Sequence, residues 1–421
     1  MSAPEMISMG CRLNIAESEK LRQNLAASNF DGENLIIVNS CAVTNEAVRQ
    51  TRQAIRRAKK HNPGKDIIVT GCAAQIDPAM FSAMPETSAV VGNGDKYDAA
   101  NFKLGLHSNR PDIRVSDIMR ITETAPHMVS AFADRSRAFV EIQNGCDHRC
   151  TFCIIPFGRG NSRSVPAGLV IEQVQALVDK GFQEVVLTGV DVTSYGPDLP
   201  GEPTLGQLIE RILKHVPALS RLRLSSLDGI EIDERLFDLL TAEARIMPHV
   251  HLSLQSGDNM ILKRMKRRHS REQAVALVER LKSKRPEIAV GADIIAGFPT
   301  EEDAMFANSL ALVEQCDIVH GHIFSYSPKQ GTPAARMPQI EGNIIKKRAK
   351  ILREAVARRA QGWRQSLIGS RQNILAEMSG DTGYAENFAR VKMDSSVTRG
   401  QIMPVEITGV QNKQLIGRVA K

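Results

Sequence analysis

The sequence has few aromatic residues and no apolar stretch long enough to cross a membrane. Only 4% of its 421 residues are aromatic, with a single tryptophan, Trp363. A membrane-spanning helix needs about 20 predominantly apolar residues, and the chain has no such run. Its first residues also lack the basic and apolar regions of a signal peptide. We therefore expect a cytoplasmic protein, in which thiols stay reduced.

Neither sign of charge dominates, since 54 basic residues against 47 acidic ones leave a net charge of +7. The excess is concentrated between Ile344 and Arg371, where nine basic residues accompany one acid, Glu354. Apolar residues at roughly helical spacing predict a long basic helix there, and a second basic helix is predicted from Asn45 to His61. Two such helices favour a nucleic-acid partner over two merely solvated faces.

Six of the seven cysteines form two sets of three. The compact trio has the spacing CxxxCxxC, and the spread trio has intervals of 30 and 31 residues. Each trio is one ligand short of a closed four-ligand site, which predicts two metal centres that each keep a position open. The alternatives are a zinc site completed by His148 and, for the spread trio, three buried structural cysteines. The trios are Cys146, Cys150 and Cys153, and Cys11, Cys41 and Cys72.

The first hundred residues alternate between strand and helix patterns. The runs MISMG, LIIVNS and DIIVTG each lead into a cysteine of the spread trio. This rhythm predicts a parallel sheet, whose strands end at one edge and bring residues far apart in sequence together. Residues 106–134, with Pro111 and Pro126, have the mixed polarity of a linker.

A longer alternation follows and predicts an open six-stranded α/β barrel with the compact trio directly after its first strand. The expected strands are 138–143, 184–190, 221–226, 249–255, 290–296 and 318–326. The expected helices are 168–180, 204–215, 233–244, 270–284 and 301–315. Short strands with glycine turns at 373–378, 386–393, 403–410 and 414–419 predict a small β-barrel of the kind used for single-stranded nucleic acid.

The run from Gly145 to Cys153, GCDHRCTFC, resembles the motif of radical S-adenosylmethionine (SAM) enzymes, with Phe152 before the last cysteine. The resemblance implies a 4Fe–4S cluster on the compact trio whose open iron chelates SAM and cleaves it to a 5′-deoxyadenosyl radical. It also implies that SAM is bordered by the aromatic residue of the motif, by three residues at strand ends and by two residues in the segment from Asp293 to Glu301. These are Phe152, Ser226, Ser253, Gln255, Asp293 and Gly297.

The segments around the spread trio, MGCRLN, NSCAVT and TGC, resemble the amino-terminal domain of methylthiotransferases. In that family the three cysteines hold a second 4Fe–4S cluster, which carries the sulfur to be inserted. The carboxy-terminal segment is similar to the family's RNA-binding TRAM domain. The resemblance implies four segments: an amino-terminal domain (1–105), the linker (106–134), a radical SAM domain (135–362) and a TRAM-like domain (363–421).

Within the family, the runs RAFVEIQNGC and CIIPFGRG look most like the enzymes that act on N6-threonylcarbamoyladenosine. The implied reaction is methylthiolation of carbon 2 of that nucleoside beside the tRNA anticodon, with one SAM as methyl donor and another as radical source. The implied partners are the anticodon stem-loop and a flavodoxin- or ferredoxin-like electron donor, while the sulfur donor stays open. Alternatives are isopentenyladenosine in tRNA or a ribosomal protein as substrate, or a non-catalytic iron–sulfur redox sensor that binds RNA.

Three further features have simpler interpretations. His249 and His251 alternate in one predicted strand and His320 and His322 in another, so each pair shares a face. Either pair is suited to be an arm of a metal site, but polar lining of the barrel is the favoured interpretation. Cys316 stands alone after a helix and is expected in the core.

Overall fold

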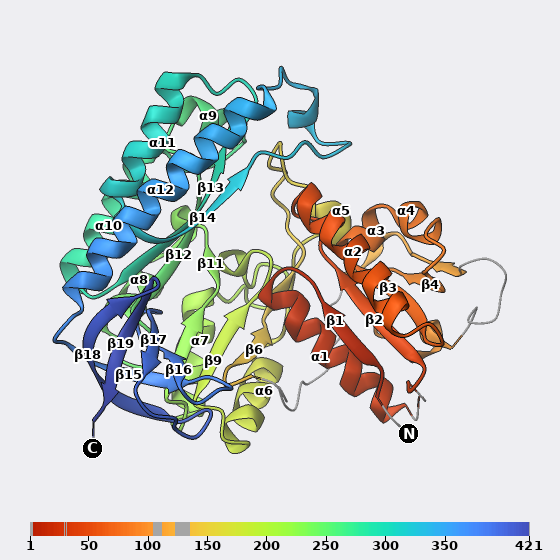
Figure 1. Cartoon of the computed structure of the whole chain (residues 1–421), viewed down its shortest axis with the longest axis horizontal. Coiled ribbons are helices and arrows are strands. Elements are labelled where there is room, and N and C mark those ends of the chain that lie inside the picture. The colour runs from red at the N-terminus through yellow and green to blue at the C-terminus, as the bar shows by residue number, and fades with distance from the viewer. Residues whose placement is uncertain (1–2, 29, 31, 104–111, 123–134, 421) are drawn as a thin grey trace.

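The computed structural model describes residues 3–28, 30, 32–103, 112–122 and 135–420. It contains a parallel five-stranded sheet, a central pair of sheets that together form an open barrel, and a closed five-stranded barrel at the carboxy terminus. Figure 1 shows the first part on one side of the central barrel and the closed barrel on the other. No helix in the described ranges is long and apolar enough to span a membrane.

The amino-terminal sheet is entirely parallel, with its strands in sequence order. The runs LIIVNS and DIIVTG form two interior strands of this sheet. Nearly all of their residues are buried, because both faces of these strands are covered. The strands are β1 (Glu5–Ser8), β2 (Leu35–Ser40), β3 (Asp66–Gly71), β4 (Ala89–Val91) and β5 (Asp112–Arg114), and the helices are α1 (Arg12–Ala27), α2 (Asn45–His61), α3 (Cys72–Ile76) and α4 (Pro78–Ser82).

Strand β5 lies within the segment expected to be a linker and pairs with β4. A short 3₁₀ turn at Ile118–Arg120 follows it. The expected linker prolines Pro111 and Pro126 lie outside the described residues. The described part of this segment therefore completes the first sheet.

The central barrel has the predicted six-strand, parallel arrangement, but it divides at Ser225 into two sheets. Apolar residues of alternate strand positions pack outward against helices, and polar ones face inward. The strands are β6 (Ala138–Glu141), β9 (Glu184–Thr188), β10 (Arg221–Leu224), β11 (Ser226–Leu227), β12 (His249–Gln255), β13 (Ala289–Ala296) and β14 (Ile318–Ser325); β7 (Gln143–Asn144) and β8 (Arg163–Ser164) form a small ribbon.

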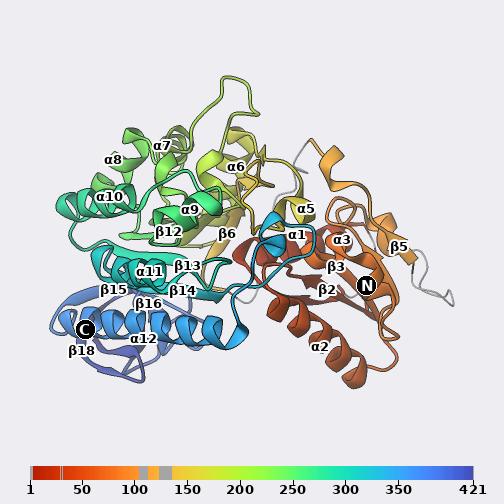
Figure 2. The same ribbon diagram turned by 90° about the horizontal axis from the view of Figure 1, so that it is seen from above.

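Helices cover the outside of this barrel, as Figures 1 and 2 show. Thr204 and Ser270 cap two of them with capping boxes. The helices are α5 (Ile155–Arg159), α6 (Ala167–Asp179), α7 (Leu205–His215), α8 (Glu234–Ala242), α9 (Asn259–Arg264), α10 (Arg271–Lys284), α11 (Asp303–Gln315) and α12 (Gly342–Ser366). Cys316 is fully buried in the core that they form.

The long basic helix is shorter than expected at its carboxy end. α12 ends at Ser366, and Arg371 begins a strand instead, because Gly369 adopts the left-handed conformation between them. In Figure 2, α12 and the other basic helix, α2, both lie along the lower edge of the molecule, whereas α7 and α8 lie along the upper edge. The two basic helices thus share one side of the protein.

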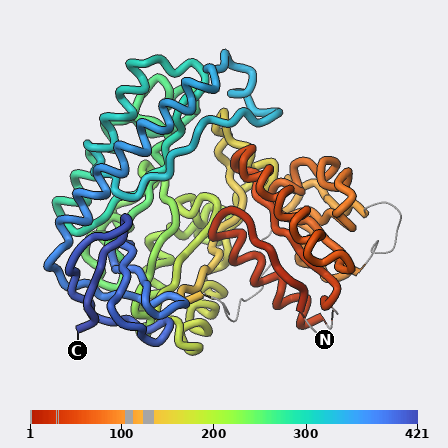
Figure 3. Tube along the Cα trace, viewed as in Figure 1, coloured from red at the N-terminus to blue at the C-terminus, as the bar shows by residue number. Residues whose placement is uncertain are grey.

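The closed barrel comprises β15 (Arg371–Ala376), β16 (Thr382–Tyr384), β17 (Arg390–Met393), β18 (Ile402–Gln411) and β19 (Gln414–Val419). Four of its strands lie in the predicted segments, although Glu386–Ala389 is a turn, and β16 is additional. Its core joins α12 through Trp363. Figure 3 follows the chain from this barrel on one side to the amino terminus on the other.

Candidate functional site

The spread trio lies at the carboxyl edge of the first sheet, as the strand rhythm predicted. Cys11 follows β1 and precedes α1, Cys41 follows β2, and Cys72 follows β3 as the first residue of α3. Cys41 and Cys72 are buried, whereas Cys11 is exposed. The parallel register of β1, β2 and β3 therefore brings three cysteines from distant parts of the chain to one place.

Gly10 and Asn14 build the loop that presents Cys11. Gly10 has a φ of +90°, and a Cβ there would lie 2.7 Å from the Cys41 sulfur, so only glycine permits this approach. Asn14 donates from Nδ2 to the carbonyl oxygens of Met9 (2.7 Å) and Ser40 (3.0 Å), which ties the Cys11 loop to the strand end before Cys41. Two cysteine-bearing loops are thus fastened together.

A buried guanidinium, that of Arg159, contacts this trio. Its Nε donates to the Cys72 sulfur at 3.1 Å, and its Nη1 lies 2.9 Å from Glu17 Oε1. Lys96 Nζ lies 2.9 Å from the other Glu17 oxygen, and all three charged side chains are at most 3% exposed. The two cations hold the pKa of Glu17 well below its usual range despite its burial. Because two cations share one acid, this group has a net positive charge directly beside the Cys72 sulfur.

The compact trio lies in the loop after β7, at the mouth of the central barrel. Gly145 has a φ of +74°, and any Cβ there would collide with the Asn161 carbonyl 1.8 Å away. Arg267 reaches the loop from the far side of the barrel, with Nη1 at 3.9 Å from the Cys150 sulfur and Nη2 at 2.8 Å from the Ser253 carbonyl. The mouth thus gathers the trio, a cation and the end of β12.

Helix α5 joins the two trios. It begins two residues after Cys153 and ends at Arg159, which contacts Cys72. A Cβ on Gly158 would lie 3.2 Å from the Cys72 Cβ, and the Gly158 carbonyl accepts from Asn93 Nδ2 at 2.5 Å. The two cysteine sets therefore face one region, with one turn of helix between them.

Burial keeps several of these thiols protonated when they hold no metal. It raises the pKa of Cys41 and of Cys153 to about 11, and it raises the pKa of Cys146 as well. A carboxylate, Asp191, adds to the effect on Cys146. Binding of a cluster would convert the thiols to thiolates and release their protons.

The sulfur spacing suits a cluster better than a single zinc ion. Four thiolates around one zinc ion, each about 2.3 Å from it, lie roughly 3.8 Å apart. In the described residues, groups of three ligand atoms within 4.8 Å of one another contain histidine and carboxylates but no cysteine. Hydrogen bonds to sulfur, such as that from Arg159, are a means of tuning iron–sulfur centres. In the described residues, therefore, neither trio is arranged as a single-zinc site, and the spread trio has a hydrogen-bond donor of the kind that iron–sulfur centres use.

His148 is turned toward carboxylates. Its Nε2 lies 3.0 Å from Asp191 Oδ2 and 3.5 Å from Glu231 Oε1, and these hydrogen bonds raise the pKa of His148 to about 10. Engaged in this way, His148 does not complete a zinc site with the compact trio.

The six residues expected around SAM occupy several levels of the barrel. Phe152 packs edge-on against Phe298, the neighbour of Gly297. Ser253 and Gln255 lie at the end of β12, and Ser226 begins the adjoining β11. Gly297 has a φ of +73° and lies against Ile345 of α12.

Asp293 lies deeper, in the middle of β13. Its Oδ1 lies 3.0 Å from His251 Nε2 and 3.1 Å from His322 Nδ1. The two histidines hold the pKa of Asp293 well below its usual range although burial opposes this. His249 and His320 lie next to this group, with ring centroids 5.3 Å apart. The histidine pairs thus line the barrel interior, as predicted.

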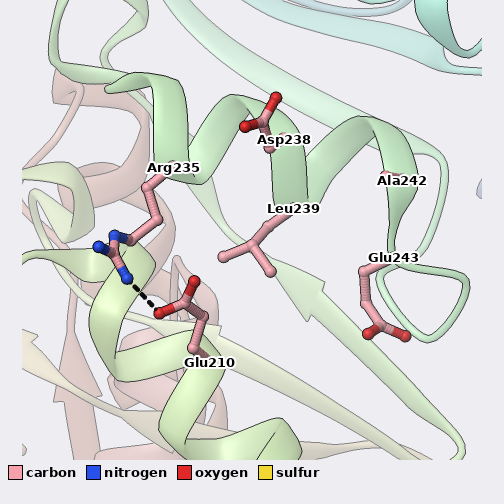
Figure 4. Close-up of a pocket in the computed structure, with 6 residues that line it drawn as sticks. All are labelled: Glu210, Arg235, Asp238, Leu239, Ala242 and Glu243. Atoms are coloured by element: carbon pink, nitrogen blue, oxygen red, sulfur yellow. Dashed lines mark hydrogen bonds and ion pairs between the residues drawn. The ribbon is translucent and has the colours of Figure 1, made fainter.

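The hollow shown in Figure 4 is a different feature. It lies on the outer surface between α7 and α8, and an ion pair between Arg235 and Glu210 crosses it. Its six lining residues include no cysteine or histidine. It therefore has none of the chemistry gathered inside the barrel.

Four residues near the cysteines were not predicted from the sequence: Arg159, Glu17, Lys96 and Arg267. Arg159 stands six residues after Cys153, and Glu17 six residues after Cys11. The signal available in the sequence was the presence of a basic and an acidic residue close to the cysteines in the chain. Only the docking of α5 on the first sheet shows that they meet.

Two family matches cover most of the chain. Residues 140–313 match the radical SAM superfamily, and residues 5–92 match a family described as uncharacterized protein family UPF0004. In addition, the protein is similar in fold to the radical SAM methyltransferase TsrM from Kitasatospora setae, solved with cobalamin and a [4Fe-4S] cluster. The TM-score is 0.57 at 15% identity, with 80% of this chain and 77% of that chain covered.

Relatives with assigned names align over nearly the whole length. The threonylcarbamoyladenosine tRNA methylthiotransferase MtaB of Rickettsia prowazekii (strain Madrid E) is 51% identical, covering 97% of this chain and 95% of the relative. MtaB of Bacillus subtilis (strain 168) is 36% identical over 81% and 77%. A tRNA-2-methylthio-N(6)-dimethylallyladenosine synthase of Roseobacter denitrificans is 29% identical over 99% of both chains.

Proposed function

The chain belongs to the family of threonylcarbamoyladenosine tRNA methylthiotransferases, and we propose on that basis that it adds a methylthio group to carbon 2 of N6-threonylcarbamoyladenosine beside the tRNA anticodon. The structural observation that carries the proposal is that α5, which follows the compact trio, contacts Cys72 of the spread trio through Arg159. Methylthiolation needs both radical chemistry and a sulfur carrier. A protein with only one of the two trios would have only one of these two functions.

A 4Fe–4S cluster with SAM, when bound, supplies radical chemistry, which suits a C–H bond that is too weakly acidic for a general base. In our proposal Cys146, Cys150 and Cys153 hold that cluster. Arg267 lies beside Cys150 and fixes the end of β12 through the Ser253 carbonyl. Phe152, Ser226, Ser253, Gln255, Asp293 and Gly297 are the proposed border of the SAM site.

A second 4Fe–4S cluster, on Cys11, Cys41 and Cys72, is also part of the proposal. Arg159 and Asn93 would donate to the Cys72 sulfur, at 3.1 and 3.7 Å, and stabilise its thiolate. Placing the sulfur carrier on a separate sheet lets the substrate base lie between the two centres.

The division into domains at residues 134 and 362, with β5 counted in the first domain in place of a boundary at residue 105, and the anticodon stem-loop as the bound part of tRNA are further proposals. The exposed lysines of α12 and the arginines of α2 lie on one side of the molecule and support the second. The closed barrel beside α12 has an architecture suited to RNA. A flavodoxin- or ferredoxin-like electron donor and a cytoplasmic location complete the proposal.

The substrate is tested with anaerobically reconstituted protein, SAM, a reductant and anticodon stem-loops. We expect the methylthio product with N6-threonylcarbamoyladenosine and at most traces with isopentenyladenosine. Formation of 5′-deoxyadenosine without any methylthio nucleoside would exclude the assigned reaction. Preference for isopentenyladenosine would move the protein to the other tRNA substrate.

The two clusters are tested by iron and sulfide analysis. Replacing either trio by alanine should remove about half of the iron and leave the other half. Cys316→Ala is the matched control, because Cys316 is fully buried in the barrel core away from both trios. Full iron retention after loss of Cys11, Cys41 and Cys72 would refute the second cluster.

A further inference from the structure

A cavity of about 280 Å³ lies where the three parts of the protein meet. Arg12 enters it from the start of α1, His251, His320 and His322 from β12 and β14, and Phe388 from the closed barrel. Because Arg12 directly follows Cys11, the cavity adjoins the proposed sulfur-carrying centre. No residue of this group was assigned a role in the reaction above.

Arg12 is the cation in this cavity without an acidic partner. In the described ranges it donates no hydrogen bond and forms no ion pair, and its guanidinium carbon lies 5.3 Å from the Phe388 ring centroid. Arg137 and Arg223 contact the same ring, but they are paired with Glu377 (2.9 Å) and Glu184 (3.0 Å). A half-buried positive charge without an acidic partner favours an anionic ligand.

Two histidines add polar groups to the same cavity. Asp293 binds one ring nitrogen of His251 and one of His322, namely Nδ1 of the latter. Nε2 of His322 has no partner within the described part of the chain, and this side chain is 64% exposed. The acid thus orients the imidazoles and leaves one nitrogen for a ligand.

The proposed substrate carries the matching chemistry. A threonylcarbamoyl group has a free carboxylate and a hydroxyl, whereas the dimethylallyl group named for the Roseobacter relative is apolar. An apolar group offers an unpaired guanidinium neither a hydrogen-bond acceptor nor a negative charge.

We propose that Arg12, with His322, binds the carboxylate of the threonylcarbamoyl group and so selects this nucleoside. The inference rests on the proposed function. Phe388 takes part by holding Arg12 through its ring, and it is itself stacked on Tyr384 at 4.8 Å. The carboxy-terminal barrel then helps to recognise the modified base as well as the RNA.

The test compares stem-loops carrying threonylcarbamoyladenosine with stem-loops carrying its threoninamide analogue, in which a neutral amide replaces the carboxylate. The wild-type protein should prefer the carboxylate by roughly 10- to 100-fold in kcat/KM, the effect of a charge-assisted hydrogen bond. Arg12→Gln should lose that preference by slowing the carboxylate substrate and leaving the amide within about threefold. His322→Gln should lower the preference severalfold.

Arg22→Gln, on the same helix and ion-paired with Glu19, is the matched control and should keep the full preference. Iron content and SAM cleavage are measured in each variant, because Arg12 adjoins Cys11. Equal use of both stem-loops by the wild-type protein overturns the inference whether or not the variants fold. Failure of the wild-type protein to modify either stem-loop would instead refute the proposed function.

Discussion

Single buried side chains determine the environment of each cysteine set, and Arg159 is the clearest case. It binds Glu17 and the Cys72 sulfur at once while its side chain is only 3% exposed. A buried ion pair contributes little net stability by itself, but removal of one partner leaves an uncompensated charge. Arg159 therefore couples folding to the spread trio.

Arg159→Met should lower the free energy of unfolding by about 3 kcal/mol, since in the described residues Glu17 then keeps one cation, Lys96, and a neutral donor, Asn144. Arg235→Met is the comparison, because its pair with Glu210 in Figure 4 is exposed and should be worth at most about 1 kcal/mol. Urea denaturation under anaerobic conditions measures both. Equal losses would contradict the role of burial.

Burial of Glu301 should make the free energy of unfolding depend on pH. Its side chain is 1% exposed, and burial raises its pKa to about 7 although Arg348 opposes this. Between pH 4.5 and 7 the folded protein therefore binds more protons at this site than the unfolded chain, so stability falls as pH rises through this window. The loss should be roughly 1–3 kcal/mol.

Glu301→Gln should remove this dependence when denaturation curves at pH 5 and pH 7.5 are compared. Asp303→Asn is the control, because Asp303 also binds Arg348 but its side chain is 98% exposed. If the glutamine variant kept the wild-type slope, another group would have to be responsible.

At the scale of elements, α12 has two faces with different tasks. Leu352 and Val356 pack against the barrel, and Arg348 is buried in pairs with Glu301 and Asp303. Lys346, Lys347 and Lys350 are exposed. Only the exposed face is therefore free to meet RNA phosphates.

Replacing Lys346, Lys347 and Lys350 by glutamine should weaken tRNA binding and reduce the slope of log affinity against log salt by about 2. The control replaces Lys180, Arg211 and Lys214, which are exposed near α6 and α7 on the other side of the molecule. Binding measured from low to high salt distinguishes them. An equal change in both triple variants would indicate only a general charge effect.

Elements with strong periodicity were predicted closely, and short ones were missed. β2, β3, α2, β12 and β19 have the expected bounds, because apolar runs and capping residues define them locally. The five residues IPFGR of α5 have no such pattern, and their helix depends on contact with α3. The bridge between the trios is therefore a tertiary feature that the sequence alone did not indicate.

At the scale of the molecule, the three parts share one interior. Phe388 of the closed barrel touches Arg12 of the first part and His249 of the central barrel. Asn45, at the start of α2, binds Ser327 beyond β14. The proposed metal, nucleoside and RNA sites, which come from separate parts of the chain, are thereby held in one arrangement, as a reaction between two centres would require.

Methylthiolation of N6-threonylcarbamoyladenosine by this protein is best tested by mass spectrometry of tRNA nucleosides from cells that lack the gene. We expect that 2-methylthio-N6-threonylcarbamoyladenosine disappears and that its unthiolated precursor accumulates. The wild-type gene should restore the product, and a gene with Cys72→Ala or Cys150→Ala should not. If the level of the methylthio nucleoside stayed unchanged in cells that have no second methylthiotransferase for this nucleoside, the assigned reaction would be wrong.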